Sequence, residues 1–469
     1  MKILNLQKPM RAKQMHQSEP YIDTPAYQKS LLRRQSNIRF FYHYYTGEIY
    51  RNRAEWAQGN GYSPSIEPPP IYVNYARLVV DRLASFSFDR VLGVRLGDEF
   101  LPAQGRPNPK VSFSEPASLM LKFLSSSGFL THLTPIAREV LTAGDGLLKL
   151  YYSPASEFPL SFGFIPADSF DYEHEADDVS KVVFYRESYN FQVAGEVLKQ
   201  HTEDHYLSES RIYNDEIKPI RKGLRLNSYL DIQLPTLFSA REKPFTRVPN
   251  PFSFLPFVHL ANRRPFGEKF GVSELKDITV LIDDINFKIS QRSRNISRTM
   301  NAILKNVNGR IIHDRLDDTQ VITVLGDGAQ LEYLTNDAGF DGADKHIHDL
   351  KQAITDLTGT VMLSPEKLTS IGALSGFALS ILYEPLLNAA NSKRAEIGSK
   401  IEQFLKLVLL GFADIGLANA DQVEHLQPSL VYGPDLQFTE DEKLTRLKRL
   451  QMVKEMGIEG EQEPAVIEG

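Results

Sequence analysis

The sequence predicts an α+β protein, and three observations support that prediction. Between residues 147 and 260, short apolar runs are separated by turn residues, as is typical of β-strands. From residue 273 to 303, apolar side chains recur every three or four residues, as on one face of a long helix. A second long helical pattern begins at Ser375-Gly376 and extends to residue 412. Strands and helices therefore occupy separate stretches of the chain.

The composition is that of an ordinary globular chain. The 469 residues are 42% hydrophobic and 24% charged, which suits two or three domains with a large core. No run of eighteen apolar residues is present, so we expect no membrane-spanning helix and no membrane partner. The N-terminus lacks the apolar segment of a signal peptide, so we expect intracellular synthesis. Without cysteine there is no disulfide framework and no thiolate metal site.

The first part of the chain is predicted to be mainly helical. Residues 26–45 have a helical pattern that stops at Thr46-Gly47. A Gly/Pro-rich stretch separates this pattern from a second helix, which has Asn74 near its start. Two more helices are expected at 117–125 and 129–143.

Apolar runs after residue 146 are predicted to be strands, because turn residues separate them. They are LLKLYY (147–152), FGFIP (162–166), KVVFYRESY (181–189), YLSESRIY (206–213), LRLNSYLDIQL (224–234) and PFVHLA (256–261).

The first long helix carries an apolar stripe over nearly thirty residues, well above the typical three turns. Its members are Leu275, Ile278, Ile282, Ile285, Ile289, Ile296, Met300 and Ile303. We expect this helix to pack against neighbours along its length, other subunits among them.

A small β module is predicted at 304–342, where VITVLGDGAQLEYL (321–334) has the pattern of a hairpin joined through Gly326-Asp327-Gly328. A shorter helix follows over 343–358, and then a loop from Gly359 to Gly372. The C-terminal region is predicted to contain a strand at 429–433 and a charged helix at 439–456.

Pro385 lies more than two turns inside the second long helix. Proline removes one backbone hydrogen bond and its ring clashes with the preceding turn, at a cost of ~3 kcal/mol. The apolar pattern nevertheless continues on both sides of it, from Ala378 to Phe412. The sequence therefore predicts one helix with a fixed bend at Pro385 and a second weak point at Gly398.

No motif of an enzyme is convincing, and neither a phosphate-binding P-loop nor a nucleophile elbow is present. HTEDH (201–205) could bind zinc if it were helical, but its flanks alternate as strands do, and we interpret it as a surface loop. DYEHEADD (171–178) lacks the ligand spacing of a calcium loop, and we interpret it as a solvated turn. Asp283-Asp284 is interpreted as a solvent-facing or subunit-facing pair. We therefore predict no catalytic site, no metal site and no cofactor.

Charge is unevenly distributed along the chain. The net charge is −6, and residues 413–469 contain twelve acids and five bases. The stretch from 288 to 310 has no acid and six bases, namely Lys288, Arg292, Arg294, Arg298, Lys305 and Arg310. Such a run is either a contact for DNA phosphates, a docking surface for acidic partners or a solvated helix face.

Several phrases resemble the portal proteins of tailed bacteriophages, and they occur in the order of that family. They are YHYYTGE (42–48), VNYARLVVDRLASFSF (73–88), the set Asn262, Gly271, Ser273, Leu275, Asp283 and Asn286, and LSGFALSILYEPLL (374–387). The resemblance covers about residues 26 to 456. It implies a portal fold with a mixed α/β wing, a two-helix stem, a small β-containing clip, a long kinked helix and a helical crown.

The resemblance divides the chain into the parts of a portal subunit. These are an N-terminal arm (1–25), the first part of the wing (26–268), stem helix 1 (269–303), the clip (304–342), stem helix 2 (343–358), the tunnel loop (359–372), the kinked wing helix (373–412), and the crown with an acidic tail (413–469).

The resemblance also implies partners and a location. We expect a ring of twelve subunits at one vertex of the virion capsid, after synthesis in the host bacterial cytoplasm. Double-stranded DNA would pass through the ring in a sequence-independent way. The ring would also contact the terminase large subunit, the major capsid and scaffolding proteins, and head–tail adaptor or tail proteins.

Roles for single residues follow from the same resemblance. In the tunnel loop, Met362, Leu363 and Leu368 would restrain DNA by steric and apolar contact, while Lys367 is its only base and Glu366 its only acid. The basic run would lie on the lower stem and the entry to the clip. The stripe residues Leu275, Ile278, Ile282, Ile285 and Ile289 would pack between subunits.

Two alternatives remain open. A head–tail adaptor is another ring protein, but adaptors are usually far shorter and lack two long helices separated by a β module. A packaging nuclease would need a carboxylate cluster with metal-ligand geometry or a nucleotide-binding loop.

Overall fold

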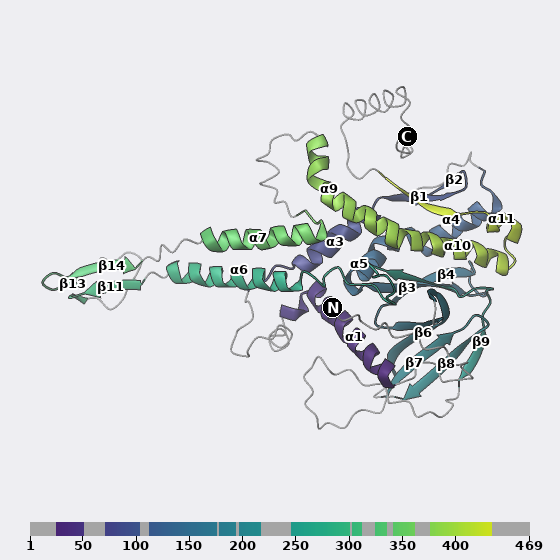
Figure 1. The fold of residues 1–469 in the computed structure, drawn as a ribbon, viewed down its shortest axis with the longest axis horizontal. Coiled ribbons are helices and arrows are strands. Elements are labelled where there is room, and N and C mark those ends of the chain that lie inside the picture. Colours follow the sequence, from purple (N-terminus) through teal and green to yellow (C-terminus); the bar gives the residue numbers. More distant parts are fainter. Residues whose placement is uncertain are drawn as a thin grey trace, which may run out of the picture.

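The computed structural model describes residues 25–50, 71–103, 112–175, 178–193, 197–216, 245–300, 303–311, 324–334, 341–361 and 376–433. The chain forms a body from which two helices project side by side (Figure 1). We call these helices, α6 (Thr279–Met300) and α7 (Asp341–Thr358), the helix pair. None of the described helices is long and apolar enough to cross a membrane.

The helices of the body lie close to the sequence-based expectations, except for one short helix near residue 420 that was not predicted. They are α1 (Pro25–Thr46), α3 (Tyr75–Phe88), α4 (Glu115–Ser127), α5 (Leu133–Ala143), α9 (Gly376–Lys393), α10 (Ser399–Asp414) and the short α11 (Ala420–Glu424). Asn74 caps α3 as its position predicted, because its side-chain oxygen accepts the backbone N–H of Arg77. After α1 the chain turns at Gly47, which has a positive φ.

Three antiparallel sheets complete the body. One has the order β10-β3-β4 and contains β3 (Asp145–Tyr152), β4 (Leu160–Pro166) and β10 (Phe257–Ala261). The largest runs β5-β6-β7-β8-β9 and contains β5 (Phe170–Glu175), β6 (Asp178–Val193), β7 (Val197–His205), β8 (Glu209–Glu216) and β9 (Thr246–Pro249). The third has the order β15-β1-β2 and contains β1 (Val91–Leu96), β2 (Glu99–Pro102) and β15 (Pro428–Tyr432).

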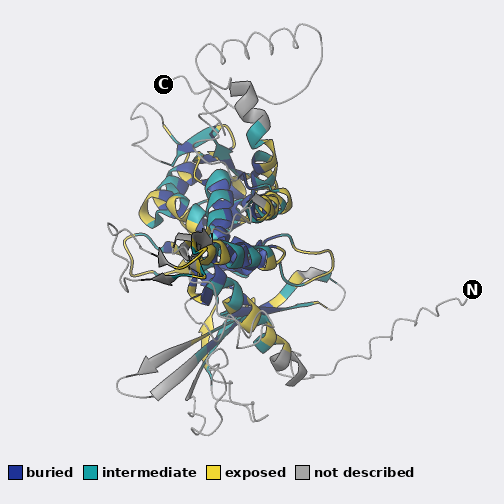
Figure 2. Cartoon of the chain, turned by 90° about the vertical axis from the view of Figure 1, so that its left-hand side faces the viewer, coloured by how far each residue is buried: buried dark blue, intermediate teal, exposed yellow. Residues whose placement is uncertain are grey.

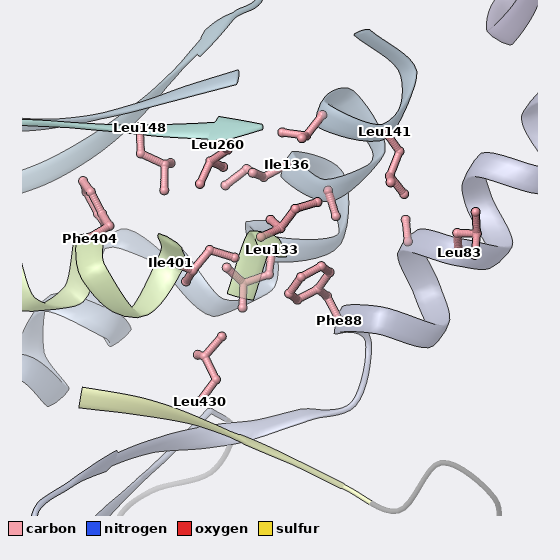
Figure 3. Packing of buried hydrophobic residues seen from close by; sticks show 14 of the residues in the cluster. Leu83, Phe88, Leu133, Ile136, Leu141, Leu148, Leu260, Ile401, Phe404 and Leu430 are labelled. Atoms are coloured by element: carbon pink, nitrogen blue, oxygen red, sulfur yellow. The ribbon is translucent and has the colours of Figure 1, made fainter. Parts of the chain in front are cut away.

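The hydrophobic core lies where α3, α5 and α10 meet the β10-β3-β4 sheet (Figure 3). Leu133 and Ile136 of α5 are buried against Phe404 of α10 and Leu148 of β3. Leu430 of β15 closes this core from the other side. Buried residues accordingly concentrate in the body (Figure 2).

The strand predicted at 429–433 is present as β15. It pairs with β1 in antiparallel register, from Val91 opposite Tyr432 to Leu96 opposite Pro428. The chain therefore remains part of the body up to residue 433. The predicted strand at 224–234 and the predicted helix at 439–456 lie outside the described residues.

The second long helix contains a local change of helical pitch. α9 and α10 are joined by a π-helical turn, Arg394–Gly398, and Pro385 lies inside α9. The ribbon changes direction within α9 before it runs on into α10 (Figure 1). Arg394 donates to the carbonyls of Phe86 (2.7 Å) and Ser87 (3.0 Å), which lie at the C-terminal end of α3. The turn thus joins the long helix to α3.

The small β module at the end of the helix pair has a different pairing from the one predicted. Val324–Leu325 (β13) pairs with Arg310–Ile311 (β12), and Gln330–Leu334 (β14) pairs with Ile303–Val307 (β11). The turn at Gly326 to Gly328 is present, but among the described residues the two strands beside it pair with β12 and β11 and not with each other. Residues 321–323 of the predicted hairpin lie outside the described residues.

DYEHEADD was interpreted as a solvated turn, and this was wrong for most of its length. Phe170–Glu175 is strand β5 and pairs with β6. Asp171 and Tyr172 are buried, and Asp171 forms an ion pair with Lys269. The carboxylate is therefore part of the interior rather than of the solvent-exposed surface.

Candidate functional site

Polar contacts and buried apolar side chains both join the two members of the helix pair. Arg292 of α6 forms an ion pair with Asp344 of α7 at 2.7 Å, and the side chains are 43% and 42% exposed. His346 of α7 lies 3.0 Å from Asp284 of α6. Exposed pairs of this kind contribute little to stability. Apolar packing adds to them, since Ile347 and Ile354 of α7 are 6% and 0% exposed and lie in the same hydrophobic cluster as Ile285 of α6.

A buried carboxylate holds the base of α6. Asp283 accepts the hydroxyl of Tyr44 at 2.6 Å and the hydroxyl of Tyr50 at 2.9 Å. Burial, together with the charge of Asp283, raises the pKa of the Tyr50 hydroxyl, which therefore stays protonated and donates. Asp283 was predicted to face solvent or another subunit. That interpretation was wrong for Asp283, which is only 3% exposed.

Two further side chains of α6 hold an extended segment, residues 71–73. Asn286 accepts the backbone N–H of Val73 at 2.8 Å and donates to the carbonyl of the same residue. One turn later, the Ser290 hydroxyl bonds both the N–H and the carbonyl of Ile71. Asn286 and Ser290 are four residues apart and lie on the same face of the helix, so they can bond Val73 and Ile71, which are two residues apart in the extended segment.

The segment before α6 crosses the end of α5 at very short range. A Cβ built on Gly271 would lie 2.3 Å from the carbonyl oxygen of Gly144 and 2.6 Å from that of Asn262. Gly144 has a positive φ and would itself meet the backbone at Ser273. Ser273 then donates to the carbonyl of Thr142 at 2.6 Å. Only glycine therefore fits at positions 144 and 271 of this crossing.

A second buried polar group completes the attachment. Asn262 donates to the carbonyl of Val272 at 2.7 Å, and its own oxygen accepts from Lys393 of α9 at 2.8 Å. Lys393 also forms an ion pair with Glu274 at 3.0 Å, with both side chains about 5% exposed or less. The residues that carried the resemblance, from Asn262 to Asn286, therefore lie together at the base of α6 and attach it to the body.

The apolar stripe of α6 belongs to the core of a single chain. Leu275, Ile278, Ile282 and Ile285 are each at most 1% exposed and lie in the main hydrophobic cluster, with Ile289 partly buried beside it. Since one chain already covers the first four, they are not available to a second subunit. The predicted packing between subunits is corrected for these four to packing within the chain. The helix also begins at Thr279, later than the predicted 269, because the preceding residues are held in the crossing.

The remaining predicted site residues are only partly described. Lys288 is half-buried, Arg292 is paired with Asp344, and Arg294 is exposed. The side chains of Arg298, Lys305 and Arg310, and the tunnel-loop residues Met362, Leu363, Glu366, Lys367 and Leu368, lie outside what the structure describes.

HTEDH, interpreted as a surface loop, is part of strand β7. Strand geometry places His201, Glu203 and His205 on one face, since they alternate along the chain. Glu187 of β6 lies opposite Glu203 in the ladder. Lys149 reaches this group from β3 of the neighbouring sheet, with its Nζ 2.8 Å from Glu187 Oε2 and 3.4 Å from Glu203 Oε2. We call Lys149, Glu187, Glu203 and His205 the intersheet cluster.

The intersheet cluster is charged. A hydrogen bond from His205 lowers the pKa of Glu203 well below its ordinary range, and the Lys149 charge acts in the same direction. Burial is the largest single influence on the pKa of Lys149 and lowers it, but the charges of Glu187 and Glu203 and the hydrogen bond to Glu187 act together, and the pKa is raised. Sequence reasoning missed Lys149 and Glu187. For His201, Glu203 and His205 the sequence did contain a signal of a shared site. They occupy alternate positions of a strand, which places three ligand-type side chains on one face.

A body with a projecting helix–strand–helix unit, followed by a long bent helix, is the architecture that the resemblance to phage portal proteins implied. Residues 26–460 match the sequence profile of the family described as phage portal protein, SPP1 Gp6-like, and the chain belongs to this family. The prediction of the family is confirmed. The protein is a structural, non-enzymatic component of the virion at the portal.

Among solved structures, chains from gene transfer agent particles match this chain at low identity. The neck of the native particle, computed with C12 symmetry, has a chain with 13% identity that covers 83% of this chain and 88% of its own, with a TM-score of 0.37. The virion of the native particle has a chain with 13% identity, coverage of 82% and 85%, and a TM-score of 0.36. No curated relative matches the sequence.

Replacing Gly271 by alanine should lower the free energy of unfolding by about 1–3 kcal/mol, because the new Cβ would overlap backbone atoms that cannot move independently. Gly342→Ala is the matched control: no atom lies within 4 Å of its Cβ, and alanine in a helix is favoured by up to ~1 kcal/mol. Denaturant unfolding of both full-length variants measures the difference. Equal stability of the two variants would show that the crossing is not rigid.

Ile282→Asp should destabilise the chain by several kcal/mol, on the order of 3–5, since it buries an unpaired charge in the core of one chain. Val280→Asp, two residues earlier at a side chain that is 73% exposed, should change stability little. Circular dichroism and thermal unfolding of the two variants test this. If the Ile282→Asp chain folds well and only fails to oligomerise, the original prediction that this stripe packs between subunits would be supported instead.

Proposed function

We propose that this protein forms the channel through which double-stranded DNA enters and leaves a phage capsid, as a ring of twelve chains at one vertex. The observation that carries the proposal is membership of the portal family over residues 26–460. In this proposal the helix pair is the stem, strands β11 to β14 belong to the clip, the sheets and helices of the body form the wing, and α9 with α10 is the kinked wing helix.

The proposal assigns the channel contacts by position along the chain. The loop between α7 and α9 includes Met362, Leu363, Glu366, Lys367 and Leu368 and is placed in the tunnel. With one base and one acid, this loop would restrain DNA by shape and apolar contact rather than by charge. DNA that must slide is best met by contacts that do not recognise sequence.

The base-rich half of α6 and the start of the clip are proposed to meet a polyanion or acidic partners. Arg292 and Arg294 are exposed on α6, and no acid follows Asp284 in that helix. Contacts with DNA phosphates would weaken steeply with salt, because bound counterions are released. In this proposal the outer surfaces of the ring dock the terminase large subunit, the major capsid and scaffolding proteins, and an adaptor or tail protein.

The oligomeric state is the first test. Mass photometry of the purified full-length chain should give a species of twelve chains of 53.1 kDa each. A stable monomer that cleaves DNA in the presence of a divalent metal would contradict the proposal.

Deletion of Leu363 to Ser370 should leave ring formation intact while reducing the packaging or retention of DNA, because the loop narrows the channel without holding subunits together. Ring mass and the DNA content of filled particles are measured for the deletion and for wild type. If particles with the deletion fill normally, the proposal that this loop lies in the channel and restrains DNA would be contradicted. Loss of the ring would mean that the segment is structural and that the channel lies elsewhere.

A further inference from the structure

The intersheet cluster has the dimensions of a metal site. Three ligand-type atoms converge there, namely Glu187 Oε2, Glu203 Oε2 and His205 Nε2. His205 Nε2 lies 3.2 Å from Glu203 Oε2 and 3.7 Å from Glu187 Oε2. In a tetrahedral zinc site with bonds of ~2.0–2.2 Å, neighbouring ligand atoms are about 3.3–3.6 Å apart. Both distances from His205 are close to that spacing, and all three ligand atoms lie within 4.8 Å of one another.

The surrounding contacts orient these side chains as they would around a metal. Ser210 Oγ lies 2.7 Å from His205 Nδ1, so the ring is held with Nε2 toward the cluster. His201 Nε2 lies 2.7 Å from Glu203 Oε1 and holds that carboxylate by its other oxygen. Partners behind the ligands that fix ring and carboxylate orientation are a regular feature of metal sites.

The cation that these ligand atoms surround is supplied by the chain itself. Lys149 Nζ lies 2.8 Å from Glu187 Oε2, 3.4 Å from Glu203 Oε2 and 3.5 Å from His205 Nε2. Lys149 is only 8% exposed, and its ammonium also lies over the ring of Tyr151 at 4.8 Å. Two adjacent carboxylates need a positive charge in a site of low polarity, and this ammonium supplies it.

We propose that the Lys149 ammonium takes the place of a metal ion in a His–Glu–Glu site, and that the cluster binds Zn²⁺ once this ammonium is removed. One imidazole nitrogen and two carboxylate oxygens suit a borderline-soft cation such as Zn²⁺ better than Ca²⁺ or Mg²⁺, which prefer more oxygen ligands. In the wild-type chain the β10-β3-β4 sheet and the five-stranded sheet are therefore joined by an internal cation, independent of any metal from the surroundings. The inference does not rest on the proposed function.

The test compares full-length wild type with Lys149→Met, which keeps the apolar length of the side chain and removes the charge. Binding of Zn²⁺ is measured by calorimetry, the visible spectrum of bound Co²⁺ shows tetrahedral geometry, and thermal unfolding is followed with Zn²⁺ or with EDTA. Wild type should unfold at the same temperature in both. Lys149→Met should be destabilised in EDTA, recover in Zn²⁺, and bind Zn²⁺ on the order of 100-fold more tightly than wild type.

A histidine pair provides the controls. His205→Ala in the Lys149→Met background should abolish the recovery, whereas His174→Ala in the same background should keep it, since His174 lies on β5 and not in the cluster. Wild type that binds equimolar Zn²⁺ and loses it with His205→Ala would overturn the proposal, because the ammonium would then not occupy the site. So would a Lys149→Met chain that gains nothing from Zn²⁺, or one that does not fold even when Zn²⁺ is present.

Discussion

The direction in which a helix pair projects from a folded body depends on the contacts at its base. Here the central contact is the Asp283 carboxylate, whose two oxygens accept the hydroxyls of Tyr44 and Tyr50. A buried carboxylate without these donors would be costly, and so would two buried hydroxyls without an acceptor. The contact joins the end of α1 to a helix more than 200 residues later. The orientation of α7 and of the strands beyond it follows from that joint.

Directional contacts of the same kind recur where elements of the body meet. Asp145, at the start of β3, accepts from His259 at 2.8 Å and from the backbone of Gly271 at 2.9 Å. Burial alone would raise the pKa of Asp145, but the His259 hydrogen bond and the nearby Arg34 keep it below its ordinary value. Two other buried ion pairs also join separate segments. They are Lys393 with Glu274 and Lys149 with Glu187. Apolar packing supplies most of the stability, whereas these buried charges define which arrangement is allowed.

The long bent helix shows how backbone irregularity and packing are linked. The π-helical turn at Arg394–Gly398 shifts the helical register between two well-packed halves. A Cβ at Gly398 would lie 2.7 Å from the Tyr432 hydroxyl, so a glycine there allows β15 to come close. The guanidinium of Arg394 lies over the ring of the same tyrosine at 4.7 Å. The irregular turn therefore joins α3, the long helix and the last described strand at one place.

The sequence alone determined the elements whose periodicity is long and regular, and with them the family. The helices around Asn74 and Pro385, and strands such as β3, β4 and β10, could be predicted because local pattern and propensity agree with the final fold. Partners of single side chains could not. Asp283 was assigned to the surface and HTEDH to a loop, because nothing local indicates that a tyrosine 239 residues away or a lysine on another sheet will meet them. The strands beside Gly326 likewise paired with β11 and β12 rather than with each other. Only the tertiary structure decides such contacts, since burial and register depend on which distant segments share the same interior.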